Sequence, residues 1–371
     1  MYRNSWIEID VDALKENVRK LKQKTKKKFI AVIKANGYGN GDAAIAKACL
    51  ESGADMLAVS SLDEALSIRN AGIGDELLIL GYVDPIHLGL CVQNNITVTA
   101  VSEHWVKMAM QQQCEGLKIH LKVDTGMNRI GFKGCDELKN GIEMLRKMRA
   151  EITGIFTHFA CSDVSDNRMT DCQMTQFQKI VEELEMPFEW IHCSNSDATV
   201  HYHESFSNAV RCGLAMFGIT SYKTDLKNVM SLYTKIIHVK KVPAGQSVGY
   251  GATYVTSKDE IIATVPIGYA DGWVRAHQGR KAYVNGYEAE FVGRICMDQA
   301  MLKLEHWEEE GTVVELIGDH LSLCQVAEEL NTIPYEVMTL LSDRLAKVYK
   351  RSGNYCESFT PRFDHLKEND A

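Results

Sequence analysis

Early in the chain stands Phe29-Ile30-Ala31-Val32-Ile33-Lys34-Ala35-Asn36-Gly37-Tyr38-Gly39, an apolar run that leads directly into a glycine-rich turn. Five consecutive apolar residues before such a turn predict a short buried β-strand. The helical spacing of apolar residues over 42–52 predicts that a helix follows the turn. Strand, turn and helix in this order form one unit of a parallel β-α structure, in which the helix packs on the strand.

The same unit recurs through the first part of the chain. Seven further strand-like segments lie at residues 56–60, 77–81, 97–101, 118–123, 152–157, 190–193 and 209–214. Helix-period segments between them lie at residues 62–70, 102–113, 136–149 and 170–185. Eight such units within about 200 residues predict a (β/α)8 barrel. An open doubly wound sheet is the alternative, but the G-x-G-x-x-G turn that often follows its first strand is missing.

The pattern changes near Met230. Short β-branched segments separated by glycine turns lie at residues 233–239, 261–266, 280–284, 288–292, 300–304 and 312–316, with helical segments at 321–330 and 335–341. We therefore predict an α/β barrel domain over residues 1–229 and a mainly-β domain over 230–371, to which residues 1–9 add a strand. A helix is predicted over 11–24, and the polar stretch 354–371 is expected to be loosely ordered.

The composition, with 371 residues of which 45% are hydrophobic and 24% charged, is that of a globular protein large enough for two domains. A net charge of −8 and the lack of a basic stripe argue against nucleic-acid binding. We find neither a secretory signal nor an apolar segment of bilayer-spanning length. The eleven cysteines include no C-x-x-C pair, which predicts reduced thiols in a cytoplasmic protein, without disulfides or a metal site.

Charged and polar side chains follow five of the predicted barrel strands, at the edge where active groups of barrels collect. They are Lys34 after the first strand, Arg129 after the fifth, His158 after the sixth, Ser196 after the seventh and Arg211 on the eighth. Each residue alone is more often structural than functional. Five of them at one edge indicate a functional site.

This set of side chains suits an anionic cofactor that carries a carbonyl group. Lys34, fixed at a strand end and partly desolvated, could attack that carbonyl as a neutral amine. Ser196 and the N–H groups that follow Asn195 and Arg211 could bind a phosphate. Arg129 could bind a substrate carboxylate. Pyridoxal 5'-phosphate is a cofactor that fits every part of this set.

Seven sequence blocks resemble motifs of the alanine racemase family. The predicted barrel contains Lys34-Ala35-Asn36-Gly37-Tyr38-Gly39, Asp124-Thr125-Gly126-Met127-Asn128-Arg129-Ile130-Gly131, Thr157-His158-Phe159-Ala160 and Val210-Arg211-Cys212-Gly213. The second domain contains Gly249-Tyr250-Gly251-Ala252-Thr253-Tyr254, Ile267-Gly268-Tyr269-Ala270-Asp271-Gly272 and Gly293-Arg294-Ile295-Cys296-Met297-Asp298. The resemblance covers nearly the whole chain in the family's order. It implies a pyridoxal-phosphate enzyme with a barrel, a C-terminal β domain and a head-to-tail homodimer with shared active sites.

The resemblance also implies two acid/base groups on opposite faces of the substrate's α-carbon, as racemisation requires. Lys34 would bond to the cofactor and act from one face, and Tyr250 would reach in from the partner subunit to act from the other. His158, supported by Arg211, would hydrogen-bond to that phenol. Arg211 would also face the cofactor's ring nitrogen, where a permanent cation should restrain decarboxylation and transamination.

Further residues take binding roles by the same resemblance. The implied cofactor-binding residues, besides Lys34, are Tyr38, His158, Asn195, Ser196, Arg211, Gly213, Leu214 and Tyr269. The implied substrate-binding residues are Arg129, Met297, Asp298 and Asp343, with alanine as the first expected substrate. Lys122 and His192 would support them, and Lys122 matches a lysine that is carbamylated in some members. The D-alanine produced would feed cell-wall peptide synthesis.

Two residues depart from the family pattern. Asn40 replaces a usual histidine beyond the cofactor contacts, where we expect a small effect. Asp343 stands where alanine racemases usually carry a tyrosine that crowds the substrate methyl, and serine racemases of this fold also have a small polar residue there. An aspartate could accept a hydrogen bond from a substrate hydroxyl, so a serine or dual serine/alanine racemase is the alternative. If Asp343 instead turns to solvent, alanine stays preferred.

Particular residues disfavour three other protein classes. Decarboxylases on a related barrel place a carboxylate near the cofactor's ring nitrogen, where this chain would place Arg211. Non-catalytic pyridoxal-phosphate carriers lack the second domain that holds Tyr250 and Met297. A metal-dependent barrel hydrolase needs an HxH pair after an early strand. The HxH of this chain is His201-Tyr202-His203, which lies late in the sequence on an expected surface helix or loop.

Overall fold

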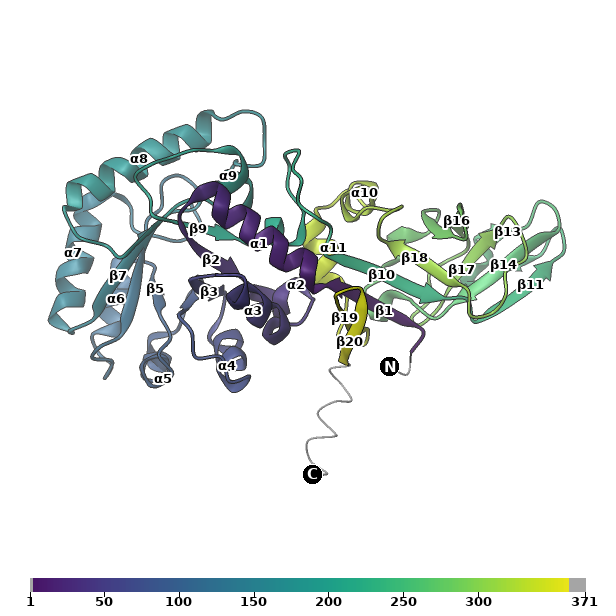
Figure 1. Ribbon diagram of the computed structural model, residues 1–371, viewed down its shortest axis with the longest axis horizontal. Coiled ribbons are helices and arrows are strands. Elements are labelled where there is room, and N and C mark those ends of the chain that lie inside the picture. Colours follow the sequence, from purple (N-terminus) through teal and green to yellow (C-terminus); the bar gives the residue numbers. More distant parts are fainter. Residues whose placement is uncertain (1–2, 360–371) are drawn as a thin grey trace, which may run out of the picture. The chain divides into compact units, whose positions relative to one another are not determined.

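The computed structural model describes residues 3–359 of the chain, which divides into two compact units (Figure 1). The barrel unit consists of Leu14–Gly37 and Asp42–Lys227. The β unit consists of the residues up to Ala13, the short segment Tyr38–Gly41 and the chain from Asn228 onward. Within residues 3–359, none of the helices has the length and hydropathy that crossing a lipid bilayer requires.

The barrel unit is built on eight parallel strands in the order β4-β3-β2-β9-β8-β7-β6-β5. They are β2 (Lys28–Val32), β3 (Met56–Val59), β4 (Leu77–Ile79), β5 (Val98–Ala100), β6 (Lys118–Lys122), β7 (Glu151–Phe156), β8 (Trp190–His192) and β9 (Ala209–Cys212). Hydrogen bonds from β4 to Thr97, just before β5, bring the two end strands together, so the barrel is nearly closed. Each predicted strand segment overlaps one of these strands, and the predicted (β/α)8 barrel is confirmed.

Helices follow the strands, and Figure 1 shows α7 and α8 running along the outside of the barrel. Apart from α2, which is described below, the helices before residue 202 are α1 (Val11–Thr25), α3 (Asp42–Glu51), α4 (Leu62–Asn70), α5 (Leu88–Gln93), α6 (Glu103–Ala109), α7 (Gly134–Lys147), α8 (Arg168–Leu184) and α9 (Ser196–His201). The 3₁₀ turns of the barrel unit are η1 (Pro85–His87) and η2 (Leu214–Phe217). Ser61, Ser102 and Asn195 cap α4, α6 and α9 by accepting backbone N–H groups of the first turn. The sequence reading missed α5 and α9, because six residues are too few to display a helical period.

The β unit contains a ten-stranded sheet in the order β11-β14-β17-β16-β15-β18-β10-β1-β19-β20. Its strands are β1 (Ser5–Asp10), β10 (Met230–Lys235), β11 (His238–Val242), β14 (Glu260–Val265), β15 (Lys281–Val284), β16 (Tyr287–Phe291), β17 (Ala300–Leu304), β18 (Val313–Ile317), β19 (Ala346–Arg351) and β20 (Asn354–Phe359). Strand β1 pairs antiparallel with β10 and parallel with β19, so the start of the chain lies between two later strands. The predicted mainly-β second domain is confirmed.

Shorter elements complete the β unit. A separate hairpin is formed by β12 (Ser247–Val248) and β13 (Tyr254–Val255). The helices are α10 (Leu323–Glu329) and α11 (Pro334–Leu340), and the 3₁₀ turns are η3 (Tyr250–Ala252), η4 (Tyr269–Asp271) and η5 (Arg275–His277). Both helices were predicted to within a few residues of these bounds.

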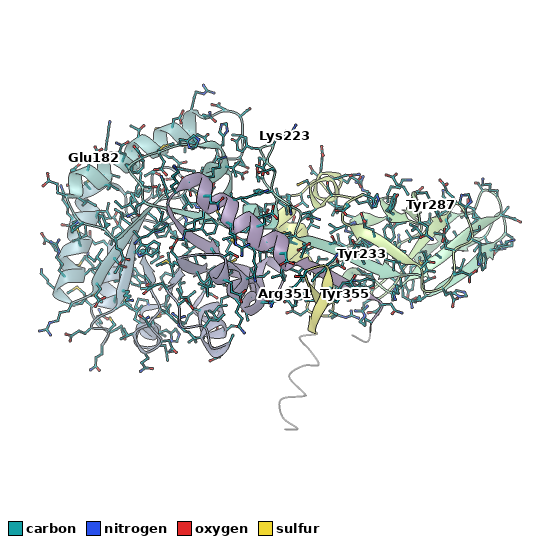
Figure 2. The ribbon with its side chains drawn as sticks, viewed as in Figure 1. Glu182, Lys223, Tyr233, Tyr287, Arg351 and Tyr355 are labelled. Atoms are coloured by element: carbon teal, nitrogen blue, oxygen red, sulfur yellow. The ribbon has the colours of Figure 1, made fainter. Side chains whose placement is uncertain are left out.

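Two predictions for the β unit are wrong. The segment 233–239, predicted as a single strand, is divided, because β10 ends at Lys235 and β11 begins at His238. The stretch from Asn354, expected to be loosely ordered, begins with strand β20, whose hydrogen bonds to β19 are independent of its polar side chains. Figure 2 shows Arg351 and Tyr355 on this hairpin, and the Tyr355 hydroxyl donates to Glu8 at 3.0 Å. Residues 360–371 lie outside the described part of the chain.

Candidate active site

A left-handed turn presents Lys34 just beyond the end of β2; Figure 1 labels this turn α2 (Lys34–Tyr38). The residues that follow Lys34 are Ala35, Asn36 and Gly37, with φ angles of 54°, 55° and 60°. Ala35 and Asn36 have side chains, and an L-residue in this region costs about 1–2 kcal/mol. Such a conformation persists only where its surroundings hold it in place.

Three hydrogen bonds hold the turn from different directions. The N–H of Gly37 donates to the carbonyl of Ile33 at 2.9 Å, and the N–H of Asp42 donates to Oδ1 of Asn36 at 3.0 Å. The N–H of Ala35 donates to Oε1 of Glu64 at 2.7 Å. The backbone next to Lys34 is therefore fixed by residues of the strand, of the following helix α3 and of helix α4.

The Lys34 amine lies in an environment that favours its neutral form. Burial lowers the pKa of Lys34, and the positive charge of Arg129 lowers it further, while the carboxylate of Glu64 acts in the opposite direction. A lowered pKa leaves more of the amine unprotonated at neutral pH, as a nucleophile or base requires.

The loop after β6 carries Arg129 on a rigid turn. Oδ1 of the buried Asp124 accepts the N–H groups of Gly126 and Asn128, each at 3.0 Å. Burial alone would raise the pKa of Asp124, but these N–H donors, together with the charges of Lys122 and Lys133, lower it. Gly131 closes the loop at a φ of 129°, where a Cβ would lie 2.7 Å from the backbone nitrogen of Asp124. The loop therefore requires glycine at this position.

Lys122, the last residue of β6, is a buried amine inside the barrel. Its Nζ donates to the carbonyl of Val123 at 2.7 Å and lies 5.6 Å from the ring centroid of Phe156. Burial, together with the charges of Arg211 and Arg129, lowers the pKa of Lys122 to about 7. Neutral and protonated forms of this amine therefore coexist near neutral pH.

Arg211 on β9 is the centre of the buried hydrogen-bond network. The residue is only 3% exposed. Its Nη2 donates to the carbonyls of Thr157 (2.8 Å) and Cys193 (3.0 Å) and lies 3.1 Å from Nδ1 of His158, while Nη1 lies 2.8 Å from Nδ1 of His192. All four acceptors are neutral groups. Burial lowers the pKa of Arg211 to about 10, so the guanidinium remains a cation at neutral pH.

The arginine determines which imidazole nitrogens carry hydrogens. A guanidinium only donates, so Nδ1 of both His158 and His192 accepts and each hydrogen lies on Nε2. Burial and the charge of Arg211 lower the pKa of both histidines well below the usual value, which keeps both rings neutral. The Nε2–H of His158 is thereby available to donate to a ligand or a second protein group.

A third histidine, His120 on β6, continues this network into the barrel core. Nε2 of His192 lies 2.9 Å from Nδ1 of His120, and burial lowers the pKa of His120 to about 3. Among residues 3–359, Nε2 of this fully buried ring has no hydrogen-bond partner. The sequence reading missed His120, although its place two residues before Lys122 puts both side chains on the same face of one strand.

Ser196 joins two loops at the edge where Lys34 lies. Its Oγ accepts the N–H groups of Gly213 and Ala215 at 3.0 and 3.1 Å, which leaves the hydroxyl hydrogen to donate to a ligand. Leu214 begins η2 directly after Gly213. The side chain of Asn195 caps α9 by accepting the N–H of Ala198 at 3.0 Å, and Ser162 donates to the same oxygen at 2.8 Å.

The remaining predicted site residues belong to the β unit. Tyr250 begins η3 between Gly249 and Gly251, whose φ angles are 75° and 72°, and it is 67% exposed. Within the described β unit this turn presents the ring outward. Lys34 and Tyr250 therefore lie in different units of the chain.

Two loops of the β unit bring together Tyr269, Met297 and Asp298. The N–H of Tyr269 donates to the carbonyl of Cys296 and that of Ala270 to the carbonyl of Met297, each at 3.0 Å. Gly268 permits this approach, because a Cβ there would lie 2.3 Å from the Cys296 carbonyl oxygen. Asp298 is bound by Arg344 at 2.6 Å, so its carboxylate has a counter-charge within the unit.

Asp343 forms an ion pair with Lys347. Nζ of Lys347 donates to Oδ1 of Asp343 at 2.7 Å. The lysine side chain is 1% exposed and the aspartate side chain 57% exposed, so the pair anchors a solvent-facing carboxylate on a buried ammonium.

The segment Tyr38–Gly41 packs on neighbouring elements of the β unit. The ring of Tyr38 lies 5.9 Å from that of Tyr335 on α11. The hydroxyl of Tyr349 on β19 donates to the carbonyl of Asn40 at 2.8 Å.

No group of three histidine, cysteine, aspartate or glutamate side chains within residues 3–359 has a metal-binding arrangement. His201 ends α9 and stacks on Tyr222 with ring centroids 4.1 Å apart. The ten cysteines from Cys49 to Cys324 are free thiols.

Comparison with known proteins covers both units. The model of the alanine racemase N-terminal domain matches residues 9–221, and the model of the C-terminal domain matches residues 229–349. Alanine racemase 1 of Bacillus subtilis (strain 168) is 39% identical over 375 residues, which cover 97% of this chain and 96% of that protein.

Solved structures show the same relationship. Alanine racemase from Bacillus anthracis with bound L-Ala-P superposes with a TM-score of 0.94 at 36% identity, covering 98% of this chain and 99% of the other. Histidine racemase from Leuconostoc mesenteroides has a TM-score of 0.88 at 29% identity, covering 94% and 99%. Because both domain models match in order and the relatives extend over nearly its full length, this chain belongs to the alanine racemase family.

Proposed function

We propose that this protein interconverts L- and D-alanine by a two-base mechanism. One observation carries the proposal. The half-buried Lys34 amine, with a pKa lowered by burial and by Arg129, extends from the same end of the barrel strands as the neutral His158 and its arginine partner. In this set Lys34 could act as a base, Arg129 could bind a carboxylate, and His158, polarised by Arg211, could donate its N–H.

Enzymes of this family use pyridoxal 5'-phosphate, and the groups of the barrel unit fit that cofactor. Lys34 offers an amine for its aldehyde, and the Ser196 hydroxyl and the N–H of Leu214 offer donors for its phosphate. Arg211, whose partners are all neutral, offers a cation for the ring nitrogen. When bound, the cofactor supplies an electron-withdrawing ring that acidifies the α-C–H bond of the substrate. Gly213, Asn195, Tyr38 and Tyr269 complete the proposed set.

The acid/base roles fall to two residues. Lys34 Nζ would exchange the α-proton on one face of the substrate, and the hydroxyl of Tyr250 of the partner subunit would exchange it on the other. A phenol acts as a base only when a donor stabilises its ionised form. The Nε2–H of His158, which Arg211 leaves available by bonding to Nδ1, would be that donor.

The remaining binding groups would orient the substrate. Arg129 and the backbone of Met297, with Asp298 nearby, would hold the substrate carboxylate. The exposed Tyr250 (67%) and Met297 (53%) support a homodimer in which the β unit of one subunit completes the site of the other. The D-alanine would be made in the cytoplasm and consumed in cell-wall peptide synthesis.

The shared site can be tested with hybrid dimers. Lys34→Ala and Tyr250→Phe should each abolish most racemisation of L-alanine, measured by the loss of circular dichroism at saturating pyridoxal phosphate. Hybrids of the two variants contain one complete site, so mixing should restore about half of the wild-type activity per hybrid. Verified hybrids without recovered activity would exclude the shared site, and an active Lys34→Ala homodimer would exclude the base assignment.

Serine, or serine together with alanine, is the second candidate substrate. Asp343 is bound to Lys347 and its side chain is 57% exposed, which is the arrangement under which alanine stays preferred. Serine turnover would require this carboxylate to accept a substrate hydroxyl in the assembled site. The histidine racemase among the similar structures supports substrate variation on this fold.

Rates for L-alanine and L-serine should therefore be compared in wild type, Asp343→Tyr and Asp343→Asn. Asparagine preserves an acceptor for Lys347 and serves as the control for folding. If tyrosine removes serine turnover but not alanine turnover, the carboxylate determines specificity. If wild type strongly prefers alanine and tyrosine changes little, Asp343 is a bystander.

A further inference from the structure

We propose that Glu64 on α4 is a positioning residue for Lys34, through a carboxylate that fastens the left-handed turn to the neighbouring strand end. The inference rests on the proposed role of Lys34 and extends it to a residue outside the seven sequence blocks given above. Glu64 touches neither the amine nor the reacting atoms, so it acts through the backbone and through its charge.

The carboxylate bridges two loops of the barrel edge. Oε1 accepts the N–H of Ala35 at 2.7 Å, and Oε2 accepts the N–H and the hydroxyl of Ser60 at 2.7 and 3.1 Å. Ala35 follows β2 and Ser60 follows β3, which are neighbours in the barrel. The same side chain therefore links the two segments that leave these strand ends.

The Glu64 side chain does not make the contact that its sequence motif predicts. Ser61-Leu62-Asp63-Glu64 is an S-x-x-E capping box, in which the glutamate normally accepts the N–H of the capping serine. Ser61 does cap α4 by accepting the Glu64 N–H at 3.3 Å. The Glu64 side chain instead extends to Ala35 and Ser60. Helix capping alone leaves this diversion unexplained, whereas holding the Lys34 turn explains it.

The turn needs such a tether because of its conformation. Ala35 has a φ of 54°, which an alanine adopts only when held. Its N–H, the first one after Lys34, is donated to Glu64, whereas the N–H of Gly37 is donated back to Ile33 and the Asn36 side chain accepts from Asp42. Loss of the tether would let Ala35 return to ordinary backbone angles and would turn the Lys34 side chain away from its place.

Glu64 also opposes Arg129 electrostatically. Burial and Arg129 lower the pKa of Lys34, and Glu64 raises it. Replacing the carboxylate by a neutral group should therefore lower the pKa of the amine still further. The two effects of Glu64 are partly separable. Glutamine carries no charge, and its single carbonyl oxygen can still accept the Ala35 N–H, but its NH₂ group cannot accept the Ser60 N–H.

Three variants of the full-length holoenzyme separate these effects: Glu64→Ala, Glu64→Gln and the control Asp63→Asn. Asp63 is an exposed acid in the same first turn of α4, so the control removes an equal charge without the tether. The first measurement is amide hydrogen exchange of peptides containing residues 34–38, which requires no turnover. The second is the pH dependence of kcat in both directions, L to D and D to L, which reports groups in the enzyme–substrate complex. The acid limb belongs to Lys34 in the direction in which Lys34 is the base.

We expect Glu64→Ala to exchange faster over residues 34–38 and to lose roughly tenfold in kcat, since misplaced catalytic groups react slowly. Glu64→Gln should exchange more slowly than Glu64→Ala, because it keeps an acceptor for the Ala35 N–H, and the acid limb of its kcat profile should move to lower pH. Asp63→Asn should match wild type in both measurements.

Wild-type exchange and an unmoved acid limb in Glu64→Ala and Glu64→Gln would overturn the inference, as would equal changes in Asp63→Asn. The exchange measurement requires no activity. Its outcome is therefore independent of the Lys34→Ala experiment, which tests the proposed function itself.

Discussion

The guanidinium of Arg211 donates from Nη1 to Nδ1 of His192 across 2.8 Å in the core of the barrel. Because Nδ1 accepts, the hydrogen of His192 lies on Nε2 and is donated to His120 2.9 Å away. One buried cation thus orders two successive imidazoles, while its other terminal nitrogen orders His158. The relation between Arg211 and its acceptors is the basis of two predictions.

Lysine cannot replace Arg211. Its single ammonium cannot reach both His158 and His192, which are bonded by different guanidinium nitrogens. We expect Arg211→Lys to lower kcat for alanine racemisation about 100-fold or more, as loss of a preorganised donor does. The control Arg149→Lys changes an exposed arginine paired with Glu115 and should leave kcat unchanged. Wild-type kcat in Arg211→Lys would remove Arg211 from the mechanism.

Stability should decline in acid because of the buried histidines. The pKa of His120 falls from 6.5 to about 3 on folding, mainly through burial. Between these values the unfolded chain binds the extra proton, so the free energy of unfolding should fall as pH drops from 6.5 toward 3. Above 6.5 this residue adds no pH dependence.

Urea titrations of His120→Leu at several pH values test this assignment. The variant should show a shallower pH slope of unfolding free energy, although it is less stable at pH 8 because the Nε2–H of His192 loses its acceptor. His203→Asn, at an exposed position, should keep the wild-type slope. Equal slopes in wild type and His120→Leu would contradict the assignment.

Lys122 should react reversibly with carbon dioxide. Burial and Arg211 lower its pKa to about 7, so a neutral amine is available whose nitrogen can bond to CO₂ and release a proton to give a carbamate. The added negative charge would stabilise Arg129, and removing dissolved CO₂ should raise KM for L-alanine. A carbamate resonance in the ¹³C spectrum after addition of labelled bicarbonate would report the modification. Lys118→Ala on the same strand should retain that resonance and Lys122→Ala should lose it; persistence in Lys122→Ala would assign it elsewhere.

Gly131 should tolerate no side chain, whereas nearby Gly134 should. Both have positive φ, but a Cβ at Gly131 would lie 2.7 Å from the backbone nitrogen of Asp124 and one at Gly134 would meet no atom within 4 Å. Gly131→Ala should displace the loop that carries Arg129 and raise KM for L-alanine. Gly134→Ala should cost about 1 kcal/mol of stability and leave KM unchanged. Similar effects of the two substitutions on KM would show that strain, and not the clash, dominates.

Much of the fold could be predicted because its signals are local. The barrel strands are short apolar runs since both of their faces are buried, and each is separated from the next by a helical period or a turn. Strand β20 carried no such signal. Its residues contain no apolar run, and it forms because Ser352 and Gly353, with φ angles of 50° and 74°, reverse the chain onto β19.

For the site, the sequence by itself determined which residue types follow each barrel strand, and hence the positions of Lys34, Arg129, His158 and Arg211 at one edge. Only the tertiary structure decided which groups those side chains contact and how far they are removed from water. Glu64 is diverted from its helix cap to Ala35, and His120 bonds to His192, through contacts between segments 29 and 72 residues apart. Hydrogen bonds and desolvation depend on distance in space, and the sequence lists residues only by their order along the chain.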